Sequence, residues 1–184
     1  METATLRYGQ VEELLARLHG ADRSAQTGAL RGRIKHLRRL GMPFGSSPGT
    51  GNKIEYEKSQ IYQFSFCLEL EELGLDPALI VSAFEMHKEF VLRTYASAER
   101  ELAKGRDYYF FLFTEFMQAR WSKKKLKFPG LATMTAGPIE KVDIVVSSLG
   151  TVHPRRVAIF NMTPCVREVL DAMQDKMVEA NPSR

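Results

Sequence analysis

Cysteine is scarce in this chain of 184 residues, and long apolar runs are absent. The two cysteines, Cys67 and Cys165, stand in apolar stretches, which predicts buried, reduced thiols rather than a disulfide framework. No apolar run approaches the ~18 residues needed to span a bilayer, and residues 1–18 lack the apolar segment of a secretory signal. We therefore expect a cytoplasmic protein with no membrane partner.

Patterns that bind metals or perform catalysis are also missing. The four histidines show no metal-ligand spacing such as HxxxH, and Cys165 has no second thiol nearby in the sequence. The glycine-rich stretch GSSPGTGNK carries a lysine but lacks the GK[ST] ending of a phosphate-binding loop. Ser46, Ser47 and Asp143 have no matching base. The sequence therefore predicts no enzymatic activity, no metal site and no cofactor.

Acidic residues are absent from one long segment. No Asp or Glu stands between Arg23 and Lys53, although the whole chain has a net charge of only +4. This segment holds Arg23, Arg31, Arg33, Lys35, Arg38, Arg39 and Lys53, and a second basic run, RWSKKKLK, follows at residues 120–127. Such segregation is typical of a surface that binds a polyanion. The alternative is a solvated helix face followed by an exposed basic loop.

Apolar spacing predicts two helices at the start of the chain, over residues 8–18 and 29–40. In the second helix, Leu30, Ile34 and Leu37 form one apolar stripe that can pack on a core. Cations lie on both flanks of this stripe: Arg31, Lys35 and Arg38 on one side, Arg33 and His36 on the other. Gly41 and Pro43 are expected to end this basic helix.

A stretch rich in glycine and proline follows the basic helix. Residues 44–56 predict a small hairpin with a Gly-rich tip, and residues 53–56 form its returning strand. Ser59 is expected to cap a third helix over residues 60–73, which Gly74 ends.

The second half of the chain begins with a long helix and then changes character. Asp76 and Pro77 are a helix start, and the amphipathic pattern continues to Gly105. The strands expected after it cover residues 107–116, 140–150 and 155–163. Thr163-Pro164 is then expected to cap a final helix over residues 165–177.

These elements predict a mainly α fold with an α+β C-terminal part. Residues 1–75 are expected to form a winged helix-turn-helix domain, and residues 76–105 a long connecting or dimerisation helix. Residues 106–184 are expected to form a small mixed sheet with a C-terminal helix, serving dimerisation or sensing.

The order helix, turn, basic helix, hairpin, helix is typical of a winged helix-turn-helix that binds DNA. A helix fits the major groove, and Arg and Lys contacts to phosphates supply most of the nonspecific affinity. Arginine suits bidentate recognition of guanine, whereas lysine suits phosphate. The candidate DNA-binding residues are Ser24, Gln26, Thr27, Arg31, Arg33, Lys35, His36, Arg38, Arg39 and Lys53.

Two stretches resemble the MerR-type family of transcriptional regulators. IKHLRRLGMP, residues 34–43, is similar to the end of the family's second helix, and residues 54–80 match its following aromatic, apolar and glycine positions. The resemblance covers roughly residues 8–84. It implies a DNA-binding regulator that dimerises through a long helix after the winged domain. By position, Lys35 stands for the family arginine that approaches the DNA backbone, and Lys53 substitutes for the wing arginine.

The function that we expect is therefore sequence-specific DNA binding by a transcriptional regulator, with double-stranded DNA as the partner. A homodimer is expected, because a single small winged domain covers little DNA. An effector, either a small molecule or a protein, would bind the C-terminal part. The alternative is a protein-interaction adaptor whose winged-helix fold has lost DNA binding.

Overall fold

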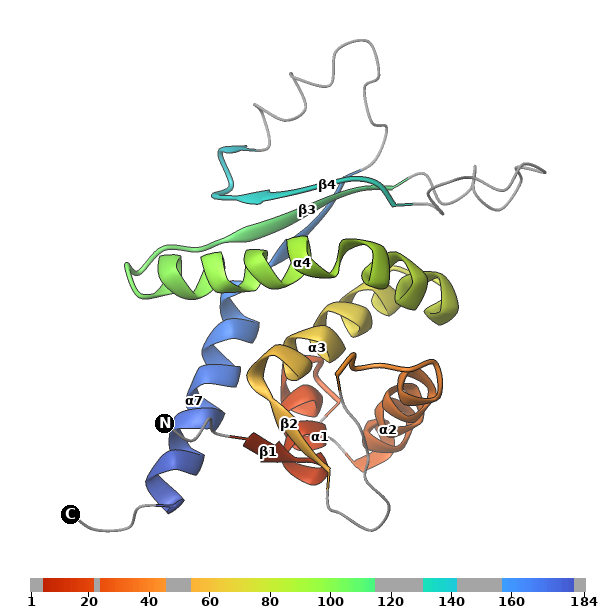
Figure 1. Cartoon of the computed structure of the whole chain (residues 1–184), viewed down its shortest axis with the longest axis vertical. Coiled ribbons are helices and arrows are strands. Elements are labelled where there is room, and N and C mark those ends of the chain that lie inside the picture. The colour runs from red at the N-terminus through yellow and green to blue at the C-terminus, as the bar shows by residue number, and fades with distance from the viewer. Residues whose placement is uncertain (1–4, 22–23, 46–53, 115–130, 142–156, 181–184) are drawn as a thin grey trace. The chain divides into compact units, whose positions relative to one another are not determined.

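A computed structural model describes residues 5–21, 24–45, 54–114, 131–141 and 157–180 (Figure 1). The chain divides into two compact units, residues 1–81 with 164–184 and residues 82–163. The described part is mainly helical and contains two small antiparallel sheets. None of its helices combines the length and apolar character needed to cross a membrane.

The first unit is built from helices around a two-stranded sheet. Its elements are β1 (Thr5–Arg7), α1 (Tyr8–Leu18), α2 (Ser24–Arg39), β2 (Glu55–Glu57), α3 (Lys58–Glu72), the start of α4 (Pro77–Leu102) and nearly all of α7 (Thr163–Ala180). Although α7 is last in the chain, the Cys165 Sγ donates a hydrogen bond to the Ser65 Oγ of α3 at 3.1 Å. The final helix therefore belongs to the same core as the first helices.

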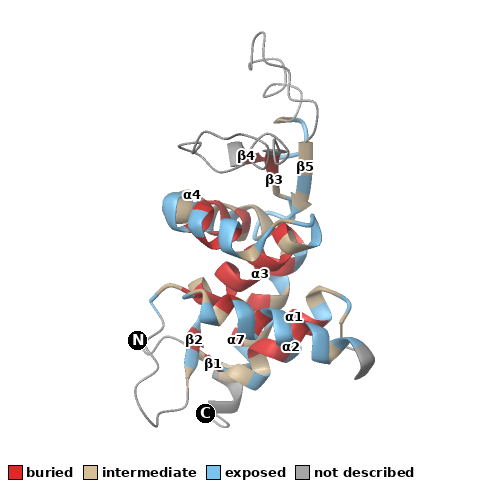
Figure 2. Ribbon diagram, turned by 90° about the vertical axis from the view of Figure 1, so that its right-hand side faces the viewer, coloured by how far each residue is buried: buried red, intermediate tan, exposed pale blue. Residues whose placement is uncertain are grey.

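Helix α2 confirms the predicted stripe, because Leu30, Ile34 and Leu37 are all buried. The helix packs against α1 and α3, and Figure 2 shows buried residues on the sides of these helices that face one another. It begins at Ser24 rather than at residue 29, so the predicted start is wrong. Its end is as predicted: Gly41 has a φ of 98°, a left-handed conformation that favours glycine.

Strand β2 has a partner that the sequence pattern did not indicate. It pairs antiparallel with β1, in a register that places Leu6 opposite Tyr56, and both of these side chains are buried. The described residues therefore contain a pairing between the two segments that precede α1 and α3, rather than the local hairpin that we expected. The predicted tip of that hairpin, residues 46–53 with Lys53, lies outside the described residues.

The helix starts are partly as predicted. Asp76 is confirmed as a cap of α4, because its Oδ1 accepts the backbone N–H groups of Ala78 and Leu79 at 2.9 and 3.2 Å. Ser59 is wrong as the cap of α3: the helix begins at Lys58, after Glu57.

The cap predicted for the final helix is also wrong. Helix α7 begins at Thr163 itself, and the Asn161 Oδ1 accepts the Thr163 backbone N–H at 3.0 Å. The Thr163 hydroxyl instead accepts the Tyr108 N–H at 3.0 Å. A side-chain acceptor two residues earlier, Asn161, therefore replaces the threonine that the sequence suggested.

The second unit contains most of α4 and a three-stranded sheet in the order β4-β3-β5. Its strands are β3 (Tyr109–Thr114), β4 (Leu131–Gly137) and β5 (Val157–Asn161). The strands expected at residues 107–116 and 155–163 are confirmed, whereas β4 was not expected. Residues 140–141 do not continue a strand, and residues 142–150 lie outside the described part. Within that part the sheet is antiparallel, so the prediction of a mixed sheet is wrong.

Candidate nucleic-acid interface

The candidate interface is the side of α2 opposite its buried stripe. Gly28, Gly32, Lys35 and Arg39 follow one another along this side at helical spacing, and all four are exposed. A Cβ added to either glycine would meet nothing within 4 Å. Nothing in the described chain covers this line, so it is open to a partner.

Two arginines on one flank of α2 are held by α1. The Arg31 Nε donates a hydrogen bond to the Glu12 Oε1 at 2.8 Å, and the Arg31 Nη2 forms an ion pair with the same oxygen at 2.6 Å. The Glu12 carboxylate raises the pKa of Arg31. Arg38 lies over the Tyr8 ring, with its guanidinium carbon 5.3 Å from the ring centroid, a cation–π contact. These two arginines therefore contribute to the junction between α1 and α2.

On the other flank, Arg33 pairs with the C-terminal turn of α3. Its guanidinium contacts Glu72 at 2.5 Å and Glu71 at 3.9 Å. Burial raises the pKa of Glu71, while Arg33 and His36 act in the opposite direction. This arginine is thus partly neutralised by acids of its own chain.

The remaining predicted residues differ in their availability. Lys35 and Arg39 are exposed, and among the described residues neither makes an ion pair. Gln26 is exposed, whereas Thr27 is half-buried and donates its hydroxyl to the Ala21 carbonyl at 3.1 Å. Nothing is described for the side chain of Ser24 or for Lys53.

The sequence reading missed the partners of the arginines. Tyr8 and Glu12 on α1, and Glu71 and Glu72 on α3, decide which cations of α2 are neutralised. Glu12 is 6% exposed, although it is charged. Glu12 stands three and four residues before Leu15 and Ala16, which places it beside the apolar side of this helix, and this spacing was the signal in the sequence.

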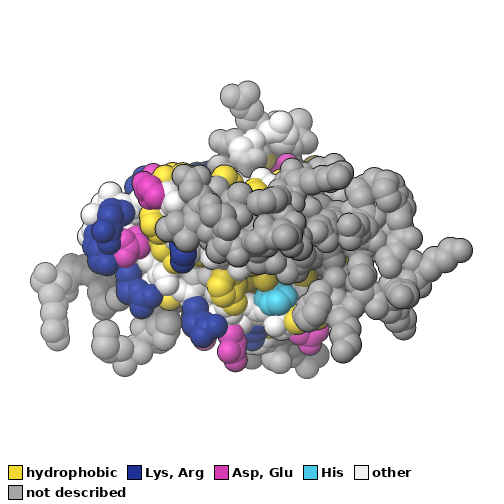
Figure 3. Space-filling model, turned by 90° about the horizontal axis from the view of Figure 1, so that it is seen from above, with side chains coloured by type: hydrophobic (Ala, Val, Ile, Leu, Met, Phe, Trp, Pro, Cys, Tyr) yellow, Lys and Arg dark blue, Asp and Glu magenta, His cyan; other side chains and the backbone are white. Residues whose placement is uncertain are grey.

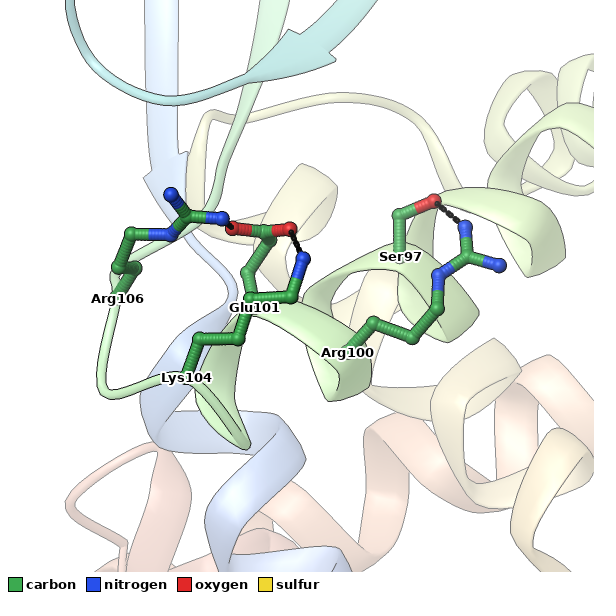
Figure 4. Close-up of polar contacts among 5 residues, drawn as sticks. All are labelled: Ser97, Arg100, Glu101, Lys104 and Arg106. Carbon is green, nitrogen blue, oxygen red and sulfur yellow. Dashed lines mark hydrogen bonds and ion pairs between the residues drawn. The ribbon is translucent and has the colours of Figure 1, made fainter.

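A second group of cations lies in the other unit, at the end of α4. Figure 3 shows Lys and Arg side chains gathered at one edge of a face, next to acidic side chains. Glu101 binds both Lys104, at 2.8 Å, and Arg106, while Arg100 donates to the Ser97 hydroxyl at 2.9 Å (Figure 4). Cations here also suit the negative end of the helix dipole. These cations therefore have a structural role: they stabilise the turn that follows α4.

The described residues offer neither a cluster of metal ligands nor a reactive thiolate at Cys67. No group of three or more His, Cys, Asp or Glu side chains within them could hold a metal ion. Cys67 and Cys165 are buried and form no disulfide in the described part of the chain, which confirms the predicted buried thiols. Burial raises the pKa of the Cys67 thiol well above its usual range, so it stays protonated at neutral pH.

Comparison with known proteins adds no assignment. No protein-family model matches the chain, and a search of curated proteins found no match. The functional argument therefore depends on the residues and geometry of the chain itself.

Proposed function

We propose that the first unit binds double-stranded DNA as a winged helix-turn-helix, with α1 and α2 as the helix pair. The β1–β2 pair would then be part of the wing. The supporting arrangement is an α2 held on α1 and α3 by its apolar stripe, with its opposite side exposed. A helix is about 10–12 Å wide with its side chains, and the major groove is about 12 Å wide.

The observation that carries this proposal is the exposed, unpaired pair Lys35 and Arg39 on the open side of α2. Within the described chain, no carboxylate neutralises them, so they are available to phosphates at no cost in broken ion pairs. Lys35 and Arg39 stand four residues apart, which places them one turn apart on the same side of the helix. Each phosphate that they neutralise releases counterions and makes the affinity depend on salt.

Base reading is assigned to the N-terminal half of α2. Recognition helices contact base edges through their N-terminal residues. Gln26 is exposed there, and its amide can make two hydrogen bonds to adenine. Gly28 and Gly32 lie on the open side of the helix with Lys35 and Arg39 rather than on the side of Gln26, and they would let the helix backbone come close to the DNA. The proposed activity is accordingly that of a sequence-specific transcriptional regulator in the cytoplasm, with an effector on the second unit.

The test is the affinity for duplex DNA across a salt series, measured by fluorescence anisotropy. The double change Lys35→Ala and Arg39→Ala should weaken binding at least tenfold at about 0.1 M salt. It should also reduce the slope of log affinity against log salt by about 1.8, since each phosphate contact contributes about 0.9.

A matched control removes two exposed cations elsewhere, through Arg100→Ala and Arg167→Ala. This control changes the net charge by the same amount but should leave the slope within about 0.5 of the wild-type value, because distant exposed charges are screened. Equal losses in both double variants, or no binding by the wild type at low salt, would contradict the proposal.

One observation favours the adaptor as a second candidate. Arg31, Arg33 and Arg38 all have partners inside the chain, which is how cations of a purely structural helix behave. Leu73 and Leu79, near the turn between α3 and α4, are each 42% exposed and offer apolar contact area. Binding of a protein partner that ignores salt and the Lys35 and Arg39 changes would select this function.

A further inference from the structure

Glu12 holds an unusual position for a carboxylate beside a candidate DNA-binding helix. It lies on α1 and is 6% exposed, and its Oε1 accepts a hydrogen bond from the Arg31 Nε at 2.8 Å and forms an ion pair with the Arg31 Nη2 at 2.6 Å. The Arg31 side chain, by contrast, is 52% exposed. The guanidinium therefore has its Nε and Nη2 turned towards a buried acid, while much of the side chain remains in contact with solvent.

Breaking the ion pair would cost Glu12 more than Arg31. Arg31 could be hydrated after separation, because half of its side chain is already in water. Glu12 could not, because a buried carboxylate that leaves its partner loses the hydrogen bond and the ion pair without gaining full solvation. A DNA phosphate that approached Arg31 would therefore have to share the guanidinium with Glu12 rather than displace it.

We propose that Glu12 limits the affinity of α2 for DNA, because it keeps Arg31 neutralised when phosphates are near. This inference rests on the proposed DNA binding and names a residue that sets its strength. Lys35 and Arg39, which have no ion pair among the described residues, supply the phosphate contacts. Arg31 is withheld, in the sense that it stays paired with Glu12 instead of contacting phosphate. Since phosphate contacts are independent of sequence, a withheld arginine lowers nonspecific affinity and leaves discrimination to contacts with the bases.

The opposite role would make Glu12 a positioning residue that orients Arg31 towards phosphate. The two roles give effects of opposite sign when the charge of Glu12 is removed and its shape is kept. Loss of orientation would weaken binding, whereas release of a withheld arginine strengthens it and adds one phosphate contact to the salt dependence.

The experiment compares Glu12→Gln with wild type for binding to duplex DNA of random sequence across a salt series. We expect binding to tighten by about three- to tenfold at about 0.1 M salt, and the salt slope to steepen by about 0.9. The matched control is Glu13→Gln, the adjacent residue on α1, whose side chain is 75% exposed and pairs with Arg17 instead. This control should change the affinity by less than twofold, because its charge is solvated and screened.

A third comparison tests whether the effect passes through Arg31. In an Arg31→Ala background, Glu12→Gln should no longer steepen the slope. Weaker binding by Glu12→Gln, an effect equal to that of Glu13→Gln, or an unchanged effect in the Arg31→Ala background would each overturn the inference. In all three cases the wild type still binds DNA and the proposed function stands. If the wild type itself does not bind, the proposed function fails and the inference with it.

A second measurement covers the case in which Glu12→Gln does not fold. The Arg31 Nε–H signal of the labelled wild-type protein can be followed by NMR during titration with DNA. We expect this signal to keep its chemical shift, because the Nε–H stays bound to Glu12, while the amides around Lys35 shift. Movement of the Arg31 signal in step with those amides would contradict the withheld state.

Discussion

Single residues decide how much of the positive charge of α2 is available. Arg31, Arg33 and Lys35 look equivalent in the sequence, yet only Lys35 lacks an ion pair among the described residues. The difference comes from acids on neighbouring helices, which neutralise the two arginines. A count of basic residues therefore overestimates the electrostatic contact that this helix can make.

His19, which ends α1, shows the same dependence on its neighbours and makes the fold sensitive to pH. Burial lowers its pKa, with the Glu72 carboxylate acting against this and Arg33 adding to it. A lowered pKa means that the fold prefers the neutral imidazole. The stability contributed by His19 is therefore complete above its usual pKa of about 6.5 and declines as the pH falls below that value.

We expect His19→Gln to reduce this loss. Urea unfolding of both proteins at pH 7.5 and pH 5.5 should show that wild type loses up to about 1 kcal/mol more free energy of unfolding than the variant does. Glu71 has a raised pKa and acts in the opposite direction, but it is present in both proteins and cancels in the comparison. An equal pH dependence in the two proteins would show that His19 titrates alike in the folded and unfolded chains.

At the scale of the element, α2 is a helix whose intrinsic propensity is poor. Gly28 and Gly32 lie in its interior, where each glycine costs about 1 kcal/mol relative to alanine. The helix forms because its apolar stripe is buried against α1 and α3. Nothing in the described chain requires the absence of a Cβ at either position.

The double change Gly28→Ala and Gly32→Ala should therefore raise the free energy of unfolding, by about 1–2 kcal/mol in urea denaturation. If α2 lies against DNA as proposed, the same protein should bind duplex DNA more weakly, because two methyl groups keep the helix backbone away. A variant that is more stable but binds DNA more weakly would show that this side of α2 contacts DNA rather than solvent. A more stable variant with unchanged affinity for DNA would show that these glycines do not lie in the interface.

At the scale of the whole molecule, the last helix, α7, packs in the same unit as the first helices. Besides the contact between Cys165 and Ser65, the Arg17 guanidinium on α1 lies 3.5 Å from the Glu168 carboxylate on α7. A truncation of the last helix would therefore expose the core of the first unit. The proposed DNA-binding unit depends on both ends of the sequence.

The proposed homodimer is a prediction at this scale. One small winged domain contacts too little DNA for high specificity, and two copies would read two half-sites. Sedimentation velocity at micromolar concentration should give twice the mass of the 20.9 kDa chain for the protein alone, and that mass plus the mass of the duplex for the complex with DNA. A protein that remains monomeric both with and without DNA would contradict the dimer.

The sequence by itself determined what depends on local periodicity. The helix over residues 8–18, the apolar stripe of α2, the Asp76 cap and the aromatic strand β3 were all predictable. Each follows from residues a few positions apart, whose side-chain spacing or capping geometry sets the backbone conformation. The helix starts were less predictable, since Glu57 and Asn161 compete with nearby Ser and Thr as caps.

Only the tertiary structure decided which distant segments meet. The pairing of β1 with β2 and the return of α7 to the first unit depend on burial shared by segments far apart in the chain. The partners of the arginines follow the same rule: Arg31 and Glu12 are 19 positions apart, and Arg33 and Glu72 are 39 apart. An ion pair depends on the distance between charges in space, so folding, rather than composition, left Lys35 and Arg39 without an ion pair among the described residues.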